Sequence, residues 1–536
     1  MPLTPGQSEA PPRTRTFYAE LVRRGHVDPS LWLTGVVVLA LLLVPKLFQQ
    51  AAGHTGDLDT GNYSNLAWAL SHGEGFRGSV LGRHHLGEHF SPIMLLVAPL
   101  YLLWQSAYVL MALQATAVAG AIVLALYLAD RQLRAAGMDD APGSGESAGR
   151  VRFAAGATLL VMFLFYPPLL ATWATQFQPI ELGMPLVVAA ILLMHARRNA
   201  WLTVVVFLLL CTRESSPLAV AGLAIYAAFV LRRWKLAILL GVAAGAWAGV
   251  TMGLIMPYFR TEGRWAHVRH VGPGEMWGLK LRYLAVMLLG LGPLPFLGRR
   301  AIATTASALP GIALNLAVAR ETQINFVGHY DAQTAPFLMV AAVHGVVALA
   351  TWARDAINRR DVALVPKNYL LMLAASLVIC FVLFGVANAK GPFQQVVRWY
   401  PTSQRRAFVR EASRLGKELA DAPAMSAWSL IGPQVCHRPN YMALRCGTSE
   451  KTWRAWASNR LLPGTILIVP TEHFPEECGE RPLVRSTGRA TLVYRGKMVE
   501  AWRWPDDAPQ PGTEGAARYV RTGLSVARSA STQPTP

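Results

Sequence analysis

The sequence predicts an α-helical polytopic membrane protein with a small α/β domain at its C-terminal end. Of the 536 residues, 53% are hydrophobic and only 15% are charged. Long apolar runs alternate with short arginine-rich loops, a pattern typical of chains that cross a bilayer many times. After residue 388 the sequence first predicts a polar helix within 392–424, with apolar residues at helical spacing (Phe408, Ala412, Leu415 and Leu419). The apolar runs that follow are shorter and alternate with turn signals, as expected for mixed helices and strands. This pattern excludes an ordinary soluble domain.

The first apolar run, residues 30–48, is long enough to cross a bilayer as one helix. Residues 92–128 are apolar almost throughout, and we expect one crossing there, with 93–104 as a re-entrant or surface segment. Several later runs are shorter than a perpendicular span requires, which favours a cavity opening at one surface. The full set of later apolar runs, short and long, is 153–171, 182–195, 200–211, 217–231, 236–257, 281–297, 301–319, 332–353 and 368–388. About 11 spans result between residues 30 and 388.

The net charge of +19 is concentrated in short clusters beside the apolar runs, at 197–198, 232–235, 299–300 and 354–360. Such clusters mark the cytoplasmic side of a membrane protein. No basic stripe with interleaved aromatic residues is present, so nucleic-acid binding is excluded. The predicted order is a cytoplasmic tail (1–29), a membrane domain (30–388), an extracytoplasmic α/β domain (389–505) and a disordered tail (506–536).

Ionisable residues are concentrated in the first predicted outer loop, residues 51–92. It carries five histidines and several carboxylates directly after the first span. Ionisable groups at such a position predict a functional site, here an active-site loop. Within it, residues 62–70 have apolar side chains at helical spacing and are expected to form a short amphipathic helix on the membrane.

Asp57 and Asp59 are the candidate catalytic residues of this loop. In extended backbone, residues i and i+2 share a face, so both carboxylates would point to one site. One could act as a base while the other orients it, or both could hold a divalent cation such as Mg²⁺ or Mn²⁺. The alternative is that both are turn-forming residues of a solvated loop.

His85, Glu88 and His89 form the next candidate group. A helix would place them on one face, at a spacing that metal ligands use, although Gly87 disfavours the helix. We expect substrate hydrogen bonding or capping of the next helix rather than metal binding.

Further candidate substrate-binding residues lie in the later outer loops. Arg213 could bind a lipid phosphate beside Glu214, or the two could form a simple ion pair between helices. Arg264 lies in a basic, aromatic loop (258–280) that could cover an anionic headgroup or contact phospholipid. His329 and Tyr330 begin a later span and border either the same cavity or the membrane interface.

The order of these parts resembles the GT-C superfamily of glycosyltransferases, which use polyprenyl-phosphate sugars. More closely, the chain resembles the bacterial membrane-protein family called domain of unknown function 2079. The matching stretches are DLDTGNYSNLAWALSHGEGF (57–76), GEHFSPIMLLVAPLYLLW (87–104), TRESSPLAVAGLAIYA (212–227), GHYDAQTAPFLMVAA (328–342) and MSAWSLIGPQVCHRPNYMAL (425–444). One departure is Glu214-Ser215, where the family pattern has a Glu-Asp pair.

The resemblance implies a bacterial inner-membrane enzyme that transfers a sugar from a polyprenyl-phosphate donor to a glycan, lipid or protein acceptor outside the cytoplasm. Asp59 would be the catalytic base or a metal ligand, with Asp57 as its partner. Two other classes stay open. A transporter or flippase-like protein for a lipid-linked or anionic substrate should show internal repeats and charges deep in its helices. A non-catalytic scaffold would use its outer domain to bind a partner.

Overall fold

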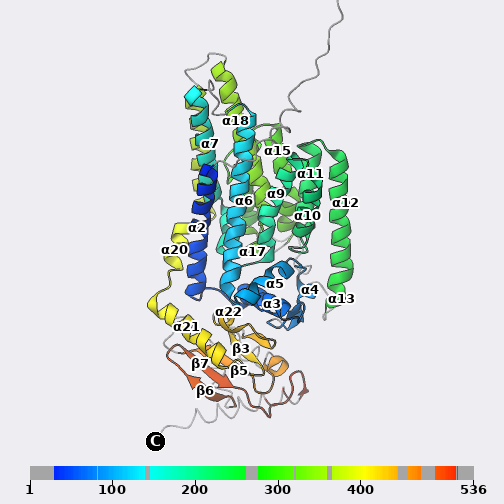
Figure 1. Ribbon diagram of the computed structural model, residues 1–536, viewed down its shortest axis with the longest axis vertical. Coiled ribbons are helices and arrows are strands. Elements are labelled where there is room, and N and C mark those ends of the chain that lie inside the picture. Colours follow the sequence, from blue (N-terminus) through cyan, green and yellow to red (C-terminus); the bar gives the residue numbers. More distant parts are fainter. Residues whose placement is uncertain are drawn as a thin grey trace, which may run out of the picture.

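The computed structural model describes residues 29–80, 82–138, 145–260, 276–318, 321–326, 328–358, 365–444, 457–471, 489–514, 516 and 519. A long helical bundle occupies most of the molecule, and a small sheet lies beyond one of its ends (Figure 1). The predicted fold class is therefore confirmed at the level of a helical membrane protein with a small C-terminal sheet.

Within the described residues, five helical segments are long and apolar enough to cross a membrane. They are α2 (Pro29–Ala51), α6 (Ala107–Ala135), α12 with its continuation to α13 (Trp234–Phe259), α18 (Ala335–Asn358) and α19 (Val365–Val386). A sixth is the pair α7 (Gly145–Phe165) and α8 (Pro167–Ala174), bent by 50° at Tyr166. This bend has a local cause, because Pro167 and Pro168 cannot continue the preceding helix.

The helices α6 and α18 lie at the centre of the bundle, with 61% and 78% of their apolar windows buried. By contrast, α2, α12 and α19 are only 17–22% buried and face outward. Shorter helices fill the space between them. These are α9 (Gly183–His195), α10 (Asn199–Leu210), α11 (Pro217–Phe229), α14 (Trp277–Leu289), α15 (Arg299–Ala306), α16 (Leu309–Ala317) and α17 (Glu321–Ile324).

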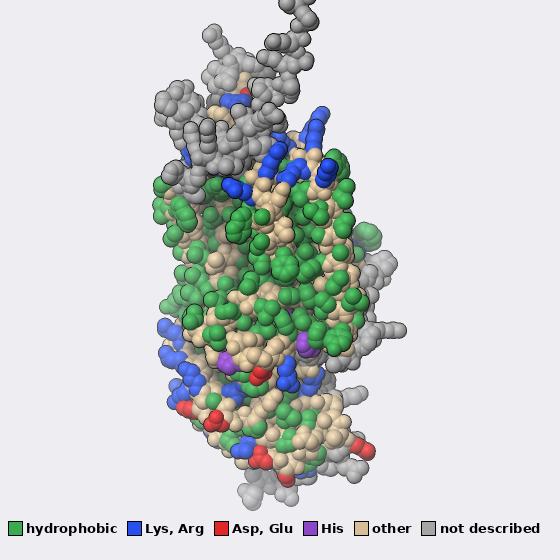
Figure 2. Space-filling model, turned by 45° about the vertical axis from the view of Figure 1, so that its right-hand side comes forward, with side chains coloured by type: hydrophobic (Ala, Val, Ile, Leu, Met, Phe, Trp, Pro, Cys, Tyr) green, Lys and Arg blue, Asp and Glu red, His purple; other side chains and the backbone are tan. Residues whose placement is uncertain are grey.

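The two ends of the bundle differ in chemistry. Exposed arginines gather at one end, in the α9–α10 and α11–α12 turns and at the start of α15: Arg197, Arg198, Arg232, Arg299 and Arg300. Between the ends, hydrophobic side chains cover the face shown in Figure 2. The first loop and the sheet lie at the opposite end (Figure 1). This is the surface expected of a protein with several membrane spans.

The first loop folds compactly against the bundle. It begins with a wide helical turn, η1 (Asp57–Gly61), continues as α3 (Asn62–Ser71), and returns through a small hairpin, β1 (Arg77–Gly78) and β2 (Arg83–His84), to α4 (His85–Glu88). Next comes α5 (Met94–Leu103), a separate ten-residue helix that precedes α6. Residues 93–104 therefore form a short segment distinct from the long span, as the sequence predicts.

The predicted helix at 62–70 exists as α3, but its expected position on the membrane surface is wrong. Nearly all of α3 is buried. Its polar face binds the C-terminal segment: Asn65 Nδ2 donates to the Cys436 and Arg438 carbonyls at 2.7 and 3.0 Å, and Ser64 Oγ lies 2.9 Å from His437 Nε2. The helix is thus held between the bundle and the sheet.

The C-terminal part consists of α20 (Pro392–Arg398), α21 (Ser403–Glu418), the one-turn α22 (Gly432–Val435) and a five-stranded mixed sheet of order β4-β3-β5-β7-β6. Its strands are β3 (Met425–Trp428), β4 (Tyr441–Leu444), β5 (Ile466–Pro470), β6 (Thr491–Arg495) and β7 (Val499–Arg503). The three strands β4, β3 and β5 run parallel, and β7 and β6 complete the sheet antiparallel. As the helical spacing predicts, α21 buries Phe408, Ala412 and Leu415 against this sheet.

Candidate active site

Polar groups from four segments meet where the bundle faces the first loop. Asp59 and His89 come from the loop itself, Gln178 follows α8, Arg213 and Glu214 form the turn between α10 and α11, and His329 precedes α18. We call this group of six the charged cluster. These segments are far apart in the sequence, and the antiparallel packing of short helices brings the turns at one end of the bundle together.

Arg213 is the centre of the charged cluster. Its Nη1 atom lies 3.2 Å from Gln178 Oε1 and 2.8 Å from His329 Nε2. Longer contacts of 3.5 Å join its Nη2 atom to His89 and its Nε atom to Glu214. The Nη2 edge is therefore the least engaged part of the guanidinium, and it is the part best able to donate to an added anion.

Glu214 anchors the cluster as a permanent anion. It accepts hydrogen bonds from the Phe90 backbone N–H at 3.0 Å and contacts His89 Nδ1 at 3.0 Å. Burial alone would raise the pKa of Glu214, but His89, Arg213 and these hydrogen bonds together hold that pKa below its ordinary value. Its charge compensates part of the positive charge of Arg213.

His329 is held neutral. Burial first, and the Arg213 guanidinium second, lower the pKa of His329 well below its ordinary value. A neutral imidazole can accept the hydrogen bond from Arg213 at Nε2. Its ring also packs against Tyr330, with 4.6 Å between the ring centroids.

Asp59 is half-buried and accepts a hydrogen bond from Gln178 Nε2. Burial raises the pKa of this carboxyl above its ordinary value, against the opposing effects of Arg213, His89 and the Gln178 hydrogen bond. A carboxylate with a raised pKa is a stronger base than a solvated aspartate. Gln178 therefore bridges a candidate base and a candidate anion-binding cation.

Asp57 does not share this site, and the expectation of extended backbone at residues 57–59 is wrong. Gly61 N donates to Gly56 O across five residues, so the segment forms a wide helical turn and the two carboxylates diverge. The Tyr441 hydroxyl lies 2.9 Å from each carboxylate oxygen of Asp57. Burial raises the pKa of Asp57 well above its ordinary value.

The loop histidines separate in a similar way. His89 joins the charged cluster, whereas His85 is buried, 3.3 Å from Ser91 Oγ and packed edge-on against Tyr63. Glu88 is half-buried. Among the described residues, no three His, Cys, Asp or Glu side chains are arranged to hold a metal ion. The charged cluster also holds the Arg213 guanidinium, whose positive charge disfavours a divalent cation beside Asp59.

The remaining candidate, Arg264, lies outside the described residues. Two important residues were not expected from the sequence. Gln178 carries no charge, although it stands in the polar interruption 175–178 between two apolar helices. Tyr441 lies in the quoted tail stretch, but nothing local shows that it reaches Asp57, which is 384 positions away.

Fold and site together define a polytopic membrane protein with a polar site where its helical bundle meets its first loop. The family model described as "Predicted membrane protein (DUF2079)" matches residues 54–271. Over these residues the match confirms the resemblance, because it includes three of the five quoted stretches; it also contains residues 54–92 of the first loop together with Gln178, Arg213 and Glu214.

Two solved structures are similar to this chain, both of ArnT from Cupriavidus metallidurans. One, bound to undecaprenyl phosphate, has 13% sequence identity and a TM-score of 0.47, and the match covers 90% of this chain and 99% of that chain. The other, in the apo state, has 12% identity and a TM-score of 0.46, with 89% and 99% covered. No curated protein matches the sequence of this chain.

Proposed function

We propose that this protein is a membrane glycosyltransferase of the GT-C type. It would transfer a sugar from a polyprenyl-phosphate donor to a glycan, lipid or protein acceptor outside the cytoplasm. The observation that carries the proposal is the Asp59–Gln178–Arg213 arrangement, which joins a carboxylate of raised pKa to a guanidinium through one amide. Such a pair supplies a base and an anion-binding cation to one reaction.

In the proposed step, Asp59 takes the proton of an acceptor hydroxyl as its oxygen attacks the anomeric carbon of the donor sugar. The bond from that carbon to the phosphate oxygen breaks, and the electron pair leaves with the lipid phosphate. Negative charge then grows on the phosphate, where Arg213 Nη2 stabilises it. Because Arg213 supplies this positive charge, the step needs no Mg²⁺ or Mn²⁺, and the cation expected from the aspartate pair remains a prediction.

Other candidate residues support this pair. Glu214, His89 and His329 hold the guanidinium from three sides, so its position is fixed before the donor binds. Asp57 is assigned a positioning role, since it fixes the turn that carries Asp59. Glu88, His85 and Tyr330 border this group, and Arg264 is proposed to contact the headgroup from the 258–280 loop.

A lipid chain would lie in an apolar groove between α10 and α12. The groove has a volume of about 800 Å³ and is lined mainly by leucine, valine and alanine side chains. At one end Trp247 contacts Phe90, whose backbone N–H binds Glu214. A chain in this groove would thus end beside the charged cluster, where its phosphate is needed.

The proposal also fixes an orientation. The arginine-rich end of the bundle would face the cytoplasm of a bacterial inner membrane, and the charged cluster and the sheet would lie outside. The short helices that reach the cluster then complete about 11 spans. A transporter or a scaffold with the same charged cluster would bind lipid without consuming it.

The test is release of sugar from a panel of radiolabelled polyprenyl-phosphate sugars by the purified full chain. Wild type, Asp59→Asn and a matched control, Glu74→Gln, are compared. Glu74 lies in the same loop but outside the charged cluster. We expect wild type and Glu74→Gln to turn over one donor at similar rates, and Asp59→Asn to lose at least about 100-fold in rate.

If the folded wild-type chain consumes no donor of the panel, or Asp59→Asn matches Glu74→Gln, the assignment of Asp59 as base is wrong. Donor binding without turnover would instead favour a transporter or flippase-like protein.

A further inference from the structure

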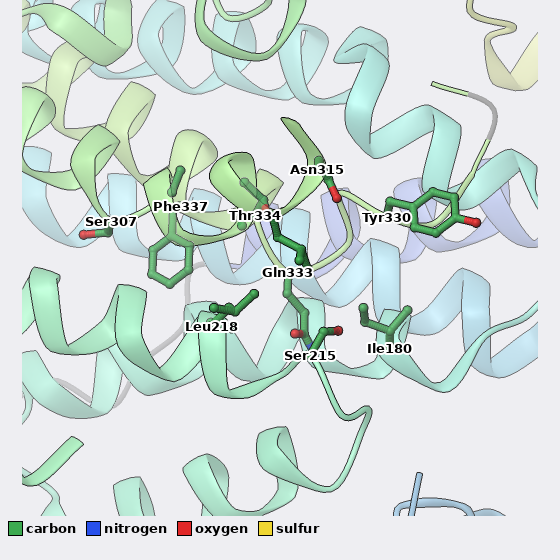
Figure 3. A pocket seen from close by; sticks show the side chains of 13 residues that line it. Ile180, Ser215, Leu218, Ser307, Asn315, Tyr330, Gln333, Thr334 and Phe337 are labelled. Carbon is green, nitrogen blue, oxygen red and sulfur yellow. The ribbon is translucent and has the colours of Figure 1, made fainter. Parts of the chain in front are cut away.

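A small cavity lies beside the charged cluster, between α11, α16 and the start of α18 (Figure 3). Its volume is about 30 Å³, room for about two water molecules. Gly311 permits the close approach of α16, because a Cβ there would overlap the Thr334 hydroxyl. The cavity is therefore a product of the packing, formed where α16 closely approaches Thr334, the residue before α18.

Its lining is polar but uncharged. Hydroxyl and amide side chains are interspersed with apolar ones around the cavity (Figure 3), and none of the lining residues carries a formal charge. The polar members are Ser215, Ser307, Asn315, Tyr330, Gln333 and Thr334. Neutral donors and acceptors beside an apolar wall fit a neutral, hydroxylated group better than an ion, because an ion would be desolvated there without a partner.

Several of these polar atoms have free hydrogen-bonding capacity among the described residues. Gln333 uses its Nε2 atom to donate to Thr212 and Ser216, at 2.7 and 2.8 Å, and its Oε1 atom accepts from no described residue. Asn315 likewise donates from Nδ2 to Asp331 at 2.9 Å and leaves Oδ1 free. Fixed amides with a free acceptor oxygen can select a ligand hydroxyl.

The cavity and the charged cluster are built from the same segments. Gln178 belongs to the cluster and Ile180 to the cavity; Arg213 belongs to the cluster and Ser215 to the cavity. In the same way His329 binds Arg213 while the next residue, Tyr330, lines the cavity. A ligand whose phosphate lies at Arg213 therefore has its neighbouring group within reach of this cavity.

We propose that the cavity is the subsite for the neutral sugar of the lipid-linked donor, an assignment that rests on the proposed function. Two sugar hydroxyls, or one hydroxymethyl group, would fill the space that two waters occupy. The ring would lie against Tyr330, which is half-exposed at the border of the cavity. Sugars with a carboxylate at this position would be rejected, since the lining offers that charge no partner.

The test compares the binding of three lipids to the full chain in detergent: a bare polyprenyl phosphate, the same lipid carrying a neutral hexose, and the same lipid carrying a hexuronic acid. The first variant, Ser215→Leu, fills the cavity. Ser215→Ala removes only the hydroxyl, and it tests the same cavity if Ser215→Leu fails to fold. Thr34→Leu on α2 is the matched control, because its hydroxyl bonds only within its own helix.

Wild type and Thr34→Leu should bind the hexosyl lipid about tenfold more tightly than the bare lipid, and more tightly than the uronic acid lipid. Ser215→Leu should abolish this preference while leaving the affinity for bare lipid within about twofold. Ser215→Ala should reduce the preference by about threefold.

A preference that survives Ser215→Leu, or a wild type that binds all three lipids equally, overturns the sugar subsite alone. Loss of bare-lipid and hexosyl-lipid binding together in Ser215→Leu also overturns it. If wild type binds none of the lipids, the proposed function fails, and the subsite fails with it.

Discussion

At the scale of single residues, Asp59 combines two properties that rarely occur together in a structural side chain. Its carboxyl is half-buried, and Gln178 stands between it and the fixed guanidinium of Arg213. Burial raises the pKa of Asp59 by more than the nearby positive groups lower it, so the net shift is upward. A group held in its less stable form is expected where chemistry, not stability, selects the residue.

This argument predicts that Asp59→Asn removes activity without lowering thermal stability. A raised pKa means that the ionised carboxylate disfavours the folded state at neutral pH, and the neutral amide does not carry that cost. The midpoint of thermal unfolding in detergent should stay the same or rise, while sugar release is lost. A clear fall in the midpoint would show instead that the Asp59 carboxylate is a structural anchor.

The same pKa shift predicts the acid side of the pH profile. A catalytic base must be ionised, so kcat/KM should fall as the pH decreases through the raised pKa of Asp59. This fall should occur at a pH higher than about 3.9, the pKa of an ordinary aspartate. His329, whose pKa is well below its ordinary value, should contribute no limb near neutrality. His329→Gln is the control, and the acid limb should persist in it. A limb that disappears in this variant would assign the titration to His329.

At the scale of elements, the turn that carries Asp59 is held by the C-terminal part of the chain. The Tyr441 hydroxyl bonds the Asp57 carboxyl, Ser429 Oγ lies 3.3 Å from the Asp57 backbone N, and Gly432 passes so close that a Cβ there would overlap Asp57. Through this contact the segment 429–441, which we call the clasp, shapes a loop that lies more than 350 positions earlier. The sheet is thus part of the site's support.

Tyr441→Phe should therefore destabilise the chain by about 1–3 kcal/mol, because it leaves a buried carboxyl without its hydroxyl donor. It should also lower kcat, since the η1 turn loosens. Tyr494→Phe is the matched control: it removes a hydroxyl that bonds Arg414 on the exposed side of the same sheet. Thermal unfolding and turnover of both variants provide the measurement. Equal, small effects in the two variants would contradict a role for the clasp.

The comparison of α21 and α3 shows what the sequence can predict about elements. Both were expected as helices from apolar spacing, and both are. The buried face of α21 follows from that spacing, because the sheet it covers comes next in the chain. The environment of α3 does not follow from the spacing, because Ser64 and Asn65 also bind a C-terminal segment that lies more than 370 positions away. Local pattern predicts an element, and distant partners decide where it lies.

The site follows the same rule. Arg213, Glu214, His89 and His329 were each indicated by a charge or an imidazole at an outer turn, and the structure brings them together. Gln178 and Tyr441 were missed because a neutral amide and a strand tyrosine look ordinary in sequence. Asp57 was placed at the site because i and i+2 side chains share a face in a strand, but the segment forms a helical turn.

At the scale of the whole molecule, the two ends of the bundle differ in their surface chemistry. Arginines gather at one end, and hydrophobic side chains cover the middle of the face drawn in Figure 2. The first loop and the sheet lie at the opposite end (Figure 1), and the charged cluster and the clasp are built from these parts. The groove between α10 and α12 runs along the bundle between its two ends. It extends from Arg233 and Lys235 at the arginine-rich end to Trp247 and Val250 toward the charged cluster. Under the proposed function, a lipid would enter this groove from the membrane and present its headgroup to the charged cluster.

A substitution that fills the groove should accordingly weaken the binding of long-chain lipids and leave the binding of short-chain lipids nearly unchanged. Ala243 lines the groove, and Ala243→Trp should raise the Kd of a long polyprenyl phosphate by about tenfold or more, because apolar chain is left unburied. A short-chain polyprenyl phosphate, held mainly by its headgroup, should change little. Val242→Trp is the control, since Val242 is 63% exposed and does not line the groove. Equal losses for the long and the short lipid in Ala243→Trp would mean that the chain binds elsewhere and that the substitution disturbs the cluster itself.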